Sequence, residues 1–186
     1  MVVLVAVAVG ALSVIVFSLK LGISPLPTSA QARVALLSLV PGDTAGEVHE
    51  LGAGWGGLAL SLARHCPRAK VVAWERSWLP WAVTWSRARL ARAPNLEVRR
   101  ADFLAADLGQ ASVLVCYLFT GGMRALDEKL RRERPGAAVS VVTNTFLLHG
   151  WPPERVLTVD DLYRTKVARY ARVPGAPTPR DDASGL

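Results

Sequence analysis

The chain has 186 residues, with 22 Lys plus Arg, 15 Asp plus Glu and a net charge of +7 at pH 7. This length fits one compact domain with a short appendage, since single domains usually contain about 100–200 residues. With 51% hydrophobic and 20% charged residues, the composition excludes a largely disordered chain. The two cysteines, Cys66 and Cys116, are far apart and lack CxxC spacing, which argues against a disulfide framework and predicts no metal site. The arginines are scattered, so we expect a solvated basic surface and no nucleic-acid partner.

The first segment, Val2 to Leu19, contains no charged residue. Its 18 residues would form a helix of ~27 Å, close to the roughly 30 Å hydrocarbon thickness of a bilayer. A cleaved signal peptide is the alternative, because small residues follow at 28–32. No Lys or Arg precedes the apolar run, however, and the run exceeds the usual ~7–15-residue signal core. We therefore expect residues 1–22 to be a single-pass transmembrane anchor.

Positive charge follows the apolar run at Lys20 and Arg33, and only the α-amino group precedes it. The positive-inside rule then places the remaining domain in the cytoplasm. Residues 23–28 contain Pro25 and Pro27 and predict a stiff linker. A domain is expected over residues 29–172. The polar, proline-rich residues 173–186 predict a disordered tail.

Within the domain, strand-like and helix-like segments alternate after a first helix. Helices are predicted at Ser29–Val40, Leu58–Arg64, Trp78–Arg92 and Met123–Arg134, and strands at Glu47–Leu51, Lys70–Trp74, Leu96–Arg100, Val113–Leu118, Ala138–Thr143, Arg155–Val159 and Tyr163–Tyr170. This order predicts an α/β fold with a doubly wound, mostly parallel seven-stranded sheet. The last two strands form a closing pair, and the polar–apolar alternation of the final one predicts an edge strand.

A glycine-rich turn follows the first predicted strand. Gly52, Gly54 and Gly56 have GxGxG spacing and precede the next helix. Glycine permits positive φ and close approach of the backbone to a ligand, and the helix start offers unpaired N–H groups. The pattern favours nucleotide or nucleoside binding, although glycine turns also form for purely conformational reasons.

Acidic residues end the next two strands. Glu75 ends the second and can accept hydrogen bonds from both hydroxyls of a ribose. Asp102 and Phe103 follow the third, where they suit the amino group and ring face of adenine. A surface salt bridge for Glu75 and a turn-forming role for Asp102 are the structural alternatives. Three such features in order on successive strands favour a nucleoside cofactor.

These positions resemble the motifs of class I methyltransferases, which bind S-adenosylmethionine (SAM) and carry an acid before GxGxG, as Glu50 does here. Gly57 also completes the GxGxxG fingerprint of NAD-binding dehydrogenases. The preceding acid, the closing strand pair and the lack of a second catalytic domain favour the methyltransferase. The resemblance implies a Rossmann-like fold, SAM as cofactor, and cofactor contacts by Glu50, Gly52, Gly54, Gly56, Glu75, Asp102 and Phe103.

The helix after Glu75 carries a closer resemblance. Its residues Pro80-Trp81-x-Val83-x-Trp85-Ser86-Arg87-x-Arg89 are similar to those of the membrane-anchored protein-lysine methyltransferases of the mitochondrial ATP synthase c subunit and the adenine nucleotide translocase. The similarity extends from the apolar N-terminus through Pro27-Thr28 to His149-Gly-Trp-Pro152. It implies a membrane-protein substrate.

Some residues depart from that pattern. The chain has Trp55-Gly56-Gly57 where the family commonly has an acid, a glycine and an arginine, and a short insertion precedes Pro80. The Gly-Trp-Gly-Gly order is also similar to cyclopropane-forming lipid methyltransferases. A small-molecule or lipid methyltransferase is therefore an alternative, as is a catalytically silent SAM-binding membrane protein.

The acceptor site is less defined. After the fourth strand, Cys116–Gly121 replaces the Asp/Asn-Pro-Pro-aromatic motif of amide-nitrogen and nucleobase methyltransferases, which disfavours those acceptors. Catalytic candidates at the strand ends are Tyr117, Thr120 and His149, with His149 the one histidine placed to act as a base. The aromatic residues Phe119, Phe146 and Trp151 are expected beside them.

Two sets of residues on the helix after Glu75 have other interpretations. The helical spacing of Trp78, Trp81 and Trp85 predicts that they pack on the sheet. The arginines at 87, 89 and 92 fit either lipid headgroups or a solvated helix face. The sequence as a whole predicts a membrane-associated methyltransferase that modifies lysine of a membrane protein.

Overall fold

The computed structural model describes residues 28–133 and 139–171. The predicted anchor at 1–22, nearly all of the linker and the predicted tail lie outside the described residues. Over the two described ranges, no helix is long and apolar enough to cross a membrane.

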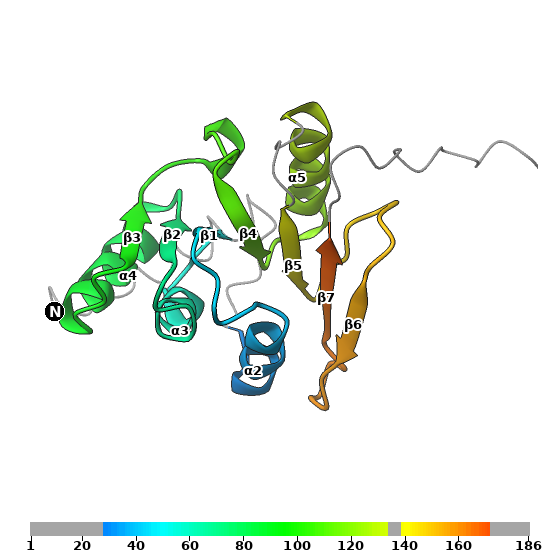
Figure 1. Cartoon of the computed structure of the whole chain (residues 1–186), viewed down its shortest axis with the longest axis horizontal. Coiled ribbons are helices and arrows are strands. Elements are labelled where there is room, and N and C mark those ends of the chain that lie inside the picture. The colour runs from blue at the N-terminus through cyan, green and yellow to red at the C-terminus, as the bar shows by residue number, and fades with distance from the viewer. Residues whose placement is uncertain (1–27, 134–138, 172–186) are drawn as a thin grey trace, which may run out of the picture.

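A single seven-stranded sheet organises the domain, in the order β3-β2-β1-β4-β5-β7-β6 (Figure 1). Its strands are β1 (Glu47–Leu51), β2 (Lys70–Trp74), β3 (Leu96–Arg99), β4 (Ala111–Cys116), β5 (Ser140–Asn144), β6 (Arg155–Thr158) and β7 (Lys166–Ala171). The first five are parallel, and β7 runs antiparallel to both β5 and β6. Every predicted strand exists, and the predicted fold class is confirmed for the described residues.

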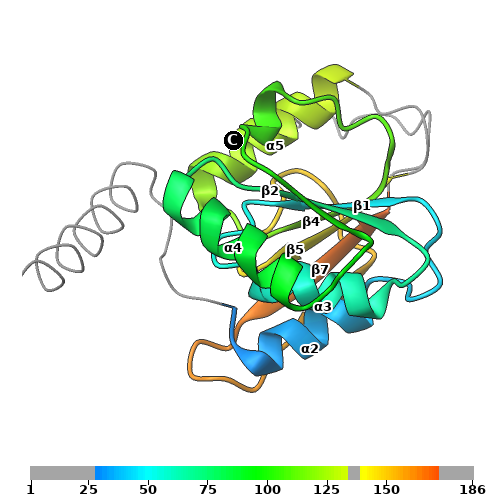
Figure 2. The ribbon, with the colours of Figure 1, turned by 90° about the vertical axis from the view of Figure 1, so that its left-hand side faces the viewer.

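Helices cover both faces of the sheet (Figure 2). One face carries α2 (Ala30–Ser38), α3 (Gly57–His65) and α4 (Trp78–Leu90), and the other carries α5 (Thr120–Glu133). The core on the first face is built from aliphatic residues such as Leu36, Leu62 and Val115. On the second face Leu114, Leu126 and Tyr170 belong to a separate core cluster. The sheet is therefore buried on both sides, as its apolar strands predicted.

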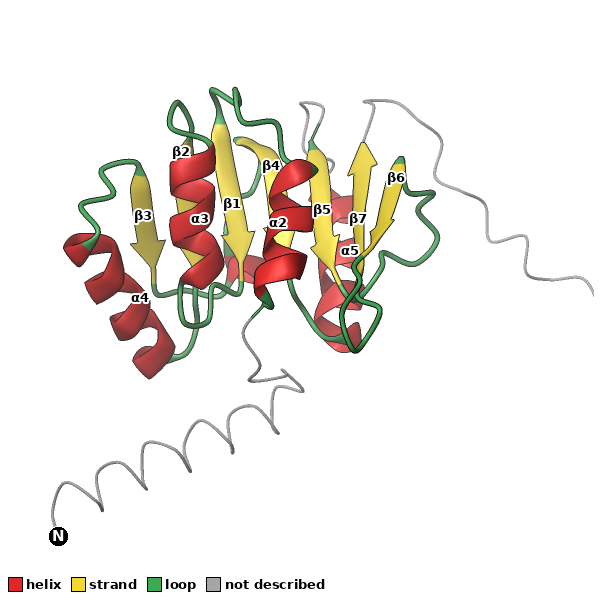
Figure 3. Cartoon of the chain, turned by 90° about the horizontal axis from the view of Figure 1, so that it is seen from below, coloured by secondary structure: helices red, strands yellow, loops and turns green. Residues whose placement is uncertain are grey.

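The last strand is not at the edge. β7 lies between β5 and β6, with Val167 and Tyr170 buried, and β6 forms the edge (Figure 3). The alternation was misleading because the polar residues of β7 have partners on its neighbours. Arg169 Nε donates to Ser140 Oγ at 3.1 Å and lies 3.4 Å from Glu154 Oε2.

The first helix, α2, is shorter than predicted. Ser29 is its N-cap and accepts a hydrogen bond from the backbone N–H of Ala32. Ala32 and Leu36 face the core, whereas Val34 is 69% exposed. The i, i+4 pair beginning at Ala32 therefore defines the buried face.

In α4 the predicted packing of the tryptophans is wrong for two of the three. Trp81 is half-buried and its Nε1 donates to Val98 O at 3.4 Å. Trp78 and Trp85 are 62% and 43% exposed. The buried positions of this helix are Thr84 and Ala88, so Trp78 and Trp85, one heptad apart, lie away from the face that meets the sheet.

The connection from β3 to β4 contains only a short 3₁₀ turn, η1 (Phe103–Ala105). The buried Lys129 on α5 fixes this connection by donating to the carbonyls of Leu104 and Ala106 and to Glu133 Oε1 at 3.0, 2.6 and 2.7 Å. These charge-assisted bonds hold the segment after Asp102 against α5.

Candidate active site

The predicted glycine turn forms directly after β1. Gly52, Gly54 and Gly56 all have positive φ, at +83°, +53° and +76°. The backbone N–H groups of Gly52 and Ala53 both donate to Trp74 O, and Gly56 is the N-cap of α3. The turn therefore joins the ends of β1 and β2 to a helix start in a conformation that favours glycine.

The three glycines differ in what surrounds them. A methyl group at Gly56 would lie 2.7 Å from the side chain of Thr84, and one at Gly52 would lie 3.2 Å from Leu118. A methyl group at Gly54 would meet nothing within 4 Å. Gly56 thus allows close helix packing, whereas Gly54 faces open space in which a ligand can approach the backbone.

Glu75 is tied to this turn through the backbone. Its carboxylate accepts hydrogen bonds from Gly54 N at 2.9 Å and from Ser77 N at 2.7 Å. The residue is 9% exposed, which contradicts the alternative of an exposed salt bridge. Each carboxylate oxygen has a second lone pair, so Glu75 can still accept hydrogen bonds from ribose hydroxyls.

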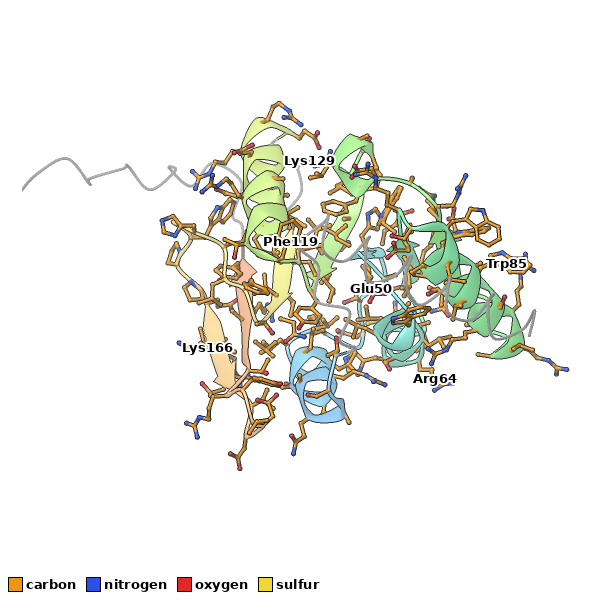
Figure 4. The ribbon with its side chains drawn as sticks, turned by 180° about the vertical axis from the view of Figure 1, so that it is seen from behind. Glu50, Arg64, Trp85, Phe119, Lys129 and Lys166 are labelled. Carbon is orange, nitrogen blue, oxygen red and sulfur yellow. The ribbon has the colours of Figure 1, made fainter. Side chains whose placement is uncertain are left out.

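Glu50 is the second acid of the site, and it is buried. Figure 4 shows Glu50 near the centre of the domain. Its Oε2 has no hydrogen-bond partner among the described residues. Burial, and secondly the nearby charge of Glu75, raise the pKa of Glu50 to about 8. A buried carboxyl group without a partner is costly, and a cation placed beside it would supply the missing partner.

Arg33 on α2 is a residue of this site that the sequence did not indicate. Its guanidinium lies beside the first turn of α3, because a methyl group at Gly57 would be 3.7 Å from Arg33 Nη2. Arg33 Nη2 donates to Thr28 O at 3.3 Å, whereas the buried Nε has no partner among the described residues. The helix start is itself partly positive, so the two together favour a bound anion such as a carboxylate.

Asp102 lies near Glu75 at the carboxyl ends of neighbouring strands. Its Oδ1 caps η1 by accepting from Leu104 N at 2.9 Å, and its Oδ2 is 3.6 Å from Nη1 of Arg76. Asp102 therefore has the turn-forming role, while its Oδ2 lies at the edge formed by the carboxyl ends of the strands. Phe103 is half-buried and packs against the core beneath α5. The predicted adenine contacts of both residues stay predictions.

The acceptor candidates lie where β4 and β5 end. Tyr117 and Phe119 are half-buried, and Thr120 is exposed at the start of α5. Between them, the buried Leu118 reaches the glycine turn, where it is the neighbour of Gly52. The end of β4 is therefore next to the candidate cofactor site.

The loop after β5 is fastened to α5 by Trp151. Its Nε1 donates to Asp127 Oδ1, and the guanidinium of Arg131 lies 5.7 Å from its ring centre. His149 is exposed in this loop, next to Gly150 with φ +72°. At the end of β5, Thr145 has φ +68°, which is rare for a β-branched residue and marks local strain at this edge. No sequence pattern indicated that strain.

Two features define the class of protein. A glycine turn is hydrogen-bonded to an acid at the end of β2, and the antiparallel strand β7 lies between β5 and the edge strand β6 of the sheet. Together they define a class I SAM-dependent methyltransferase. The chain belongs to the ANTKMT methyltransferase domain family, whose family model matches residues 50–155. A protein-lysine N-methyltransferase of Saccharolobus islandicus is 28% identical over 147 residues, which cover 74% of this chain and 84% of the relative.

Solved structures agree with this assignment. An RNA methyltransferase of Salinibacter ruber in complex with S-adenosyl-L-homocysteine (SAH) has 26% identity and a TM-score of 0.70, with 84% of this chain and 98% of the other covered. The precorrin-6y C5,15-methyltransferase of Geobacter metallireducens has 15% identity and a TM-score of 0.62, with 79% and 90% covered. The second likeness concerns the fold alone.

SAM is the cofactor, and the residues of the site fit its three polar parts. Glu75 would accept from the ribose, Arg33 would pair with the methionine carboxylate, and Glu50 would face positive charge. The open space at Gly54 leaves room for the backbone to approach the ligand. When bound, SAM supplies a methyl group that is activated by its sulfonium centre.

Proposed function

We propose that this protein is a membrane-associated methyltransferase that methylates lysine side chains of a membrane protein. The observation that carries the proposal is the family match at residues 50–155, together with a relative named protein-lysine N-methyltransferase. The bonded pair of Glu75 and the glycine turn supports an intact cofactor site.

The environment of the acceptor edge suits an uncharged amine. A lysine side chain must lose its proton before it can attack a methyl group, and its ordinary pKa is about 10.4. The aromatic rings of Tyr117, Phe119, Phe146 and Trp151 are all half-buried at this edge. Contact with apolar rings disfavours the charged ammonium and so lowers the pKa of an entering lysine. Orientation and exclusion of water would then supply most of the rate enhancement.

The membrane part of the proposal rests on the sequence. Val2 to Leu19 has the length and apolar composition of a single spanning helix, and Lys20 follows it. The proposed topology is a single-pass protein with its catalytic domain in the cytoplasm. A tether of this kind raises the effective concentration of membrane-embedded acceptors without a new contact to them.

Methyl transfer to membrane fractions tests the function. The full chain, SAM with a radiolabelled methyl group, and membranes from cells that lack the protein are incubated together. We expect label in protein, located on lysine by mass spectrometry, and no label with Glu75→Ala. Label in extracted lipid would favour a lipid methyltransferase, and label in small molecules would favour a small-molecule methyltransferase. Bound SAH without any label would identify a silent SAM-binding protein.

Topology is tested separately by protease treatment of intact cells and of inverted vesicles, followed by intact-mass analysis. We expect the domain to be digested only in inverted vesicles, with residues 1–22 retained in the mature chain. A mature chain starting near Arg33 would instead indicate a cleaved signal peptide.

A further inference from the structure

The outward face of α4 exposes large apolar side chains. Trp78, Leu79, Trp85 and Leu90 are 62%, 38%, 43% and 84% exposed. We name these four residues the α4 face. A helix that covers one side of a sheet normally presents polar residues to water, so large apolar side chains on its outward face are unusual. Figure 4 shows Trp85 at the outer side of its helix.

The charged residues of α4 have only one sign. The helix contains Arg87 and Arg89 but no Asp or Glu, and Arg92 follows it. Among the described residues, none of these arginines forms an ion pair with a carboxylate. Arg89 instead stacks on Trp85, with 5.2 Å from its Cζ to the ring centre. The α4 face therefore lies beside positive charge that has no acidic partner in the part of the chain that the structure describes.

The helix on the opposite side of the sheet provides a contrast. α5 buries Met123, Leu126 and Leu130 and exposes Arg124, Glu128 and Arg132, which carry both signs of charge. That is the ordinary pattern of a helix whose outer face contacts water. The composition of the α4 face is thus specific to one side of the molecule.

A groove lies next to the same helix. It has a volume of ≈ 630 Å³ and is lined by Trp85, Arg89 and Arg92 from α4 and its C-terminal end, and by residues of β3. Lys70 and Glu97 also line it, but these two pair with each other at 3.2 Å. The two arginines are the cations in the groove that have no acidic partner among the described residues.

We propose that the α4 face docks on an anionic lipid surface. Tryptophan favours the membrane–water interface, because its ring is apolar and its N–H is polar. Arginines beside it are attracted by anionic headgroups. Apolar area combined with basic charge is the composition of helices that lie in the interface of a bilayer.

This inference rests on the proposed function and adds how the domain would be oriented on the bilayer. α4 is bonded to the cofactor turn at two points: Thr84 Oγ1 donates to Gly54 O at 2.8 Å and Arg87 Nη1 donates to Trp55 O at 2.6 Å. Trp78 begins the helix directly after the segment that Glu75 caps. A bilayer that contacts the α4 face would therefore lie beside the cofactor site.

The experiment uses the full chain in vesicles of phosphatidylcholine, with or without phosphatidylglycerol, that contain brominated lipid. Bromine quenches tryptophan fluorescence only at short range. We compare the double variant Trp78→Phe/Trp85→Phe with the control Trp151→Phe, whose ring is held by Asp127 on α5. Because the N-terminal segment is unchanged in all variants, the quenching reports contact of α4 and not attachment of the protein.

We expect the double variant to lose roughly half or more of the quenched fluorescence, since the interfacial rings are those nearest the lipid, and we expect the control to lose none. Phosphatidylglycerol should increase the quenching of the wild type but not of Arg89→Gln/Arg92→Gln. Equal quenching in the double variant and the control would overturn the proposal.

Acrylamide, a quencher in the aqueous phase, distinguishes the other possibilities. If acrylamide quenches Trp78 and Trp85 but brominated lipid does not, the α4 face is in contact with water. If neither quenches them, another protein covers the face, such as a second copy of the chain. Either result overturns the proposal. Lysine labelling in membrane fractions is measured independently, so failure of docking and failure of the proposed function are distinguishable.

Discussion

The ends of β1 to β3, which form the cofactor half of the site, differ from the ends of β4 and β5, which form the acceptor half. In the cofactor half Glu75 is bonded to two backbone N–H groups and Glu50 is buried. In the acceptor half Thr120 and His149 are exposed and Tyr117 is half-buried. The cofactor half is thus built into the folded backbone, whereas the acceptor half consists of side chains near the surface. Changes in the first half should cost stability or affinity, and changes in the second should affect turnover alone.

The strongest test of this contrast is Gly56→Ala with Gly54→Ala as its matched control. Both glycines have positive φ, but only a methyl group at Gly56 would collide with the buried Thr84. We expect Gly56→Ala to lower the free energy of unfolding by ~2–4 kcal/mol, the sum of backbone strain and overpacking. Gly54→Ala should cost only ~1–2 kcal/mol of strain. Urea unfolding measures both, and equal losses would contradict the packing role assigned to Gly56.

A second test concerns the buried acid Glu50. Its pKa in the folded protein is about 8, above the ordinary value of 4.5, so the folded state binds more protons than the unfolded state between these pH values. The stability contribution of Glu50 therefore falls as pH rises from 4.5 to 8. We expect Glu50→Gln to be more stable than the wild type by about 3 kcal/mol at pH 7, since one pKa unit corresponds to about 1.4 kcal/mol and pH 7 lies well above the ordinary pKa of the carboxyl group. The difference should vanish near pH 4.

Urea unfolding over pH 4–9 measures this effect, with Glu128→Gln as the control because Glu128 is exposed on α5. Parallel stability curves for wild type and Glu50→Gln would contradict the raised pKa. The same variant should bind SAH less tightly, because a neutral amide cannot neutralise the cationic amino group of the ligand.

The third test asks whether Arg33 contacts the carboxylate of the cofactor. We expect Arg33→Met to weaken SAH binding by roughly 10–100-fold, the cost of a lost charged hydrogen bond. Binding of 5′-methylthioadenosine, which lacks the amino-acid carboxylate, should not change. Calorimetry with both ligands and with the control Arg64→Met measures this. Equal weakening for both ligands would show that Arg33 supports the turn in general and does not contact the carboxylate.

These residues also show which parts of the structure the sequence could predict. The glycine turn and Glu75 follow from local rules: positive φ requires glycine, and an acid at a strand end faces the ligand edge. All seven strands follow from apolar patterns of the right length. Arg33 could not be placed in this way, since its role depends on how α2 packs beside α3, which no sequence spacing encodes.

The errors have the same origin. The alternation in β7 was interpreted as an edge strand because its polar partners, Ser140 and Glu154, belong to other segments. The tryptophans of α4 were expected in the core because their spacing is helical, but spacing does not say which face meets the sheet. Thr84 and Ala88 occupy the buried face instead. In both cases the outcome depends on how two elements pack against each other, which the sequence of one element alone does not specify.

The smallest effect is expected in the acceptor half, at His149. If the apolar edge lowers the pKa of the entering lysine, its proton can pass to water, and no protein base is required. His149 is exposed and lies next to Gly150, outside the buried network that holds Trp151. We therefore expect His149→Ala to lower kcat less than about threefold and to leave the pH profile of kcat/KM unchanged in shape. General bases contribute typically ~100–10,000-fold. A loss of that size, accompanied by disappearance of an acidic limb of the pH profile, would instead make His149 the base and would place a fixed catalytic group in the half of the site where we expect none.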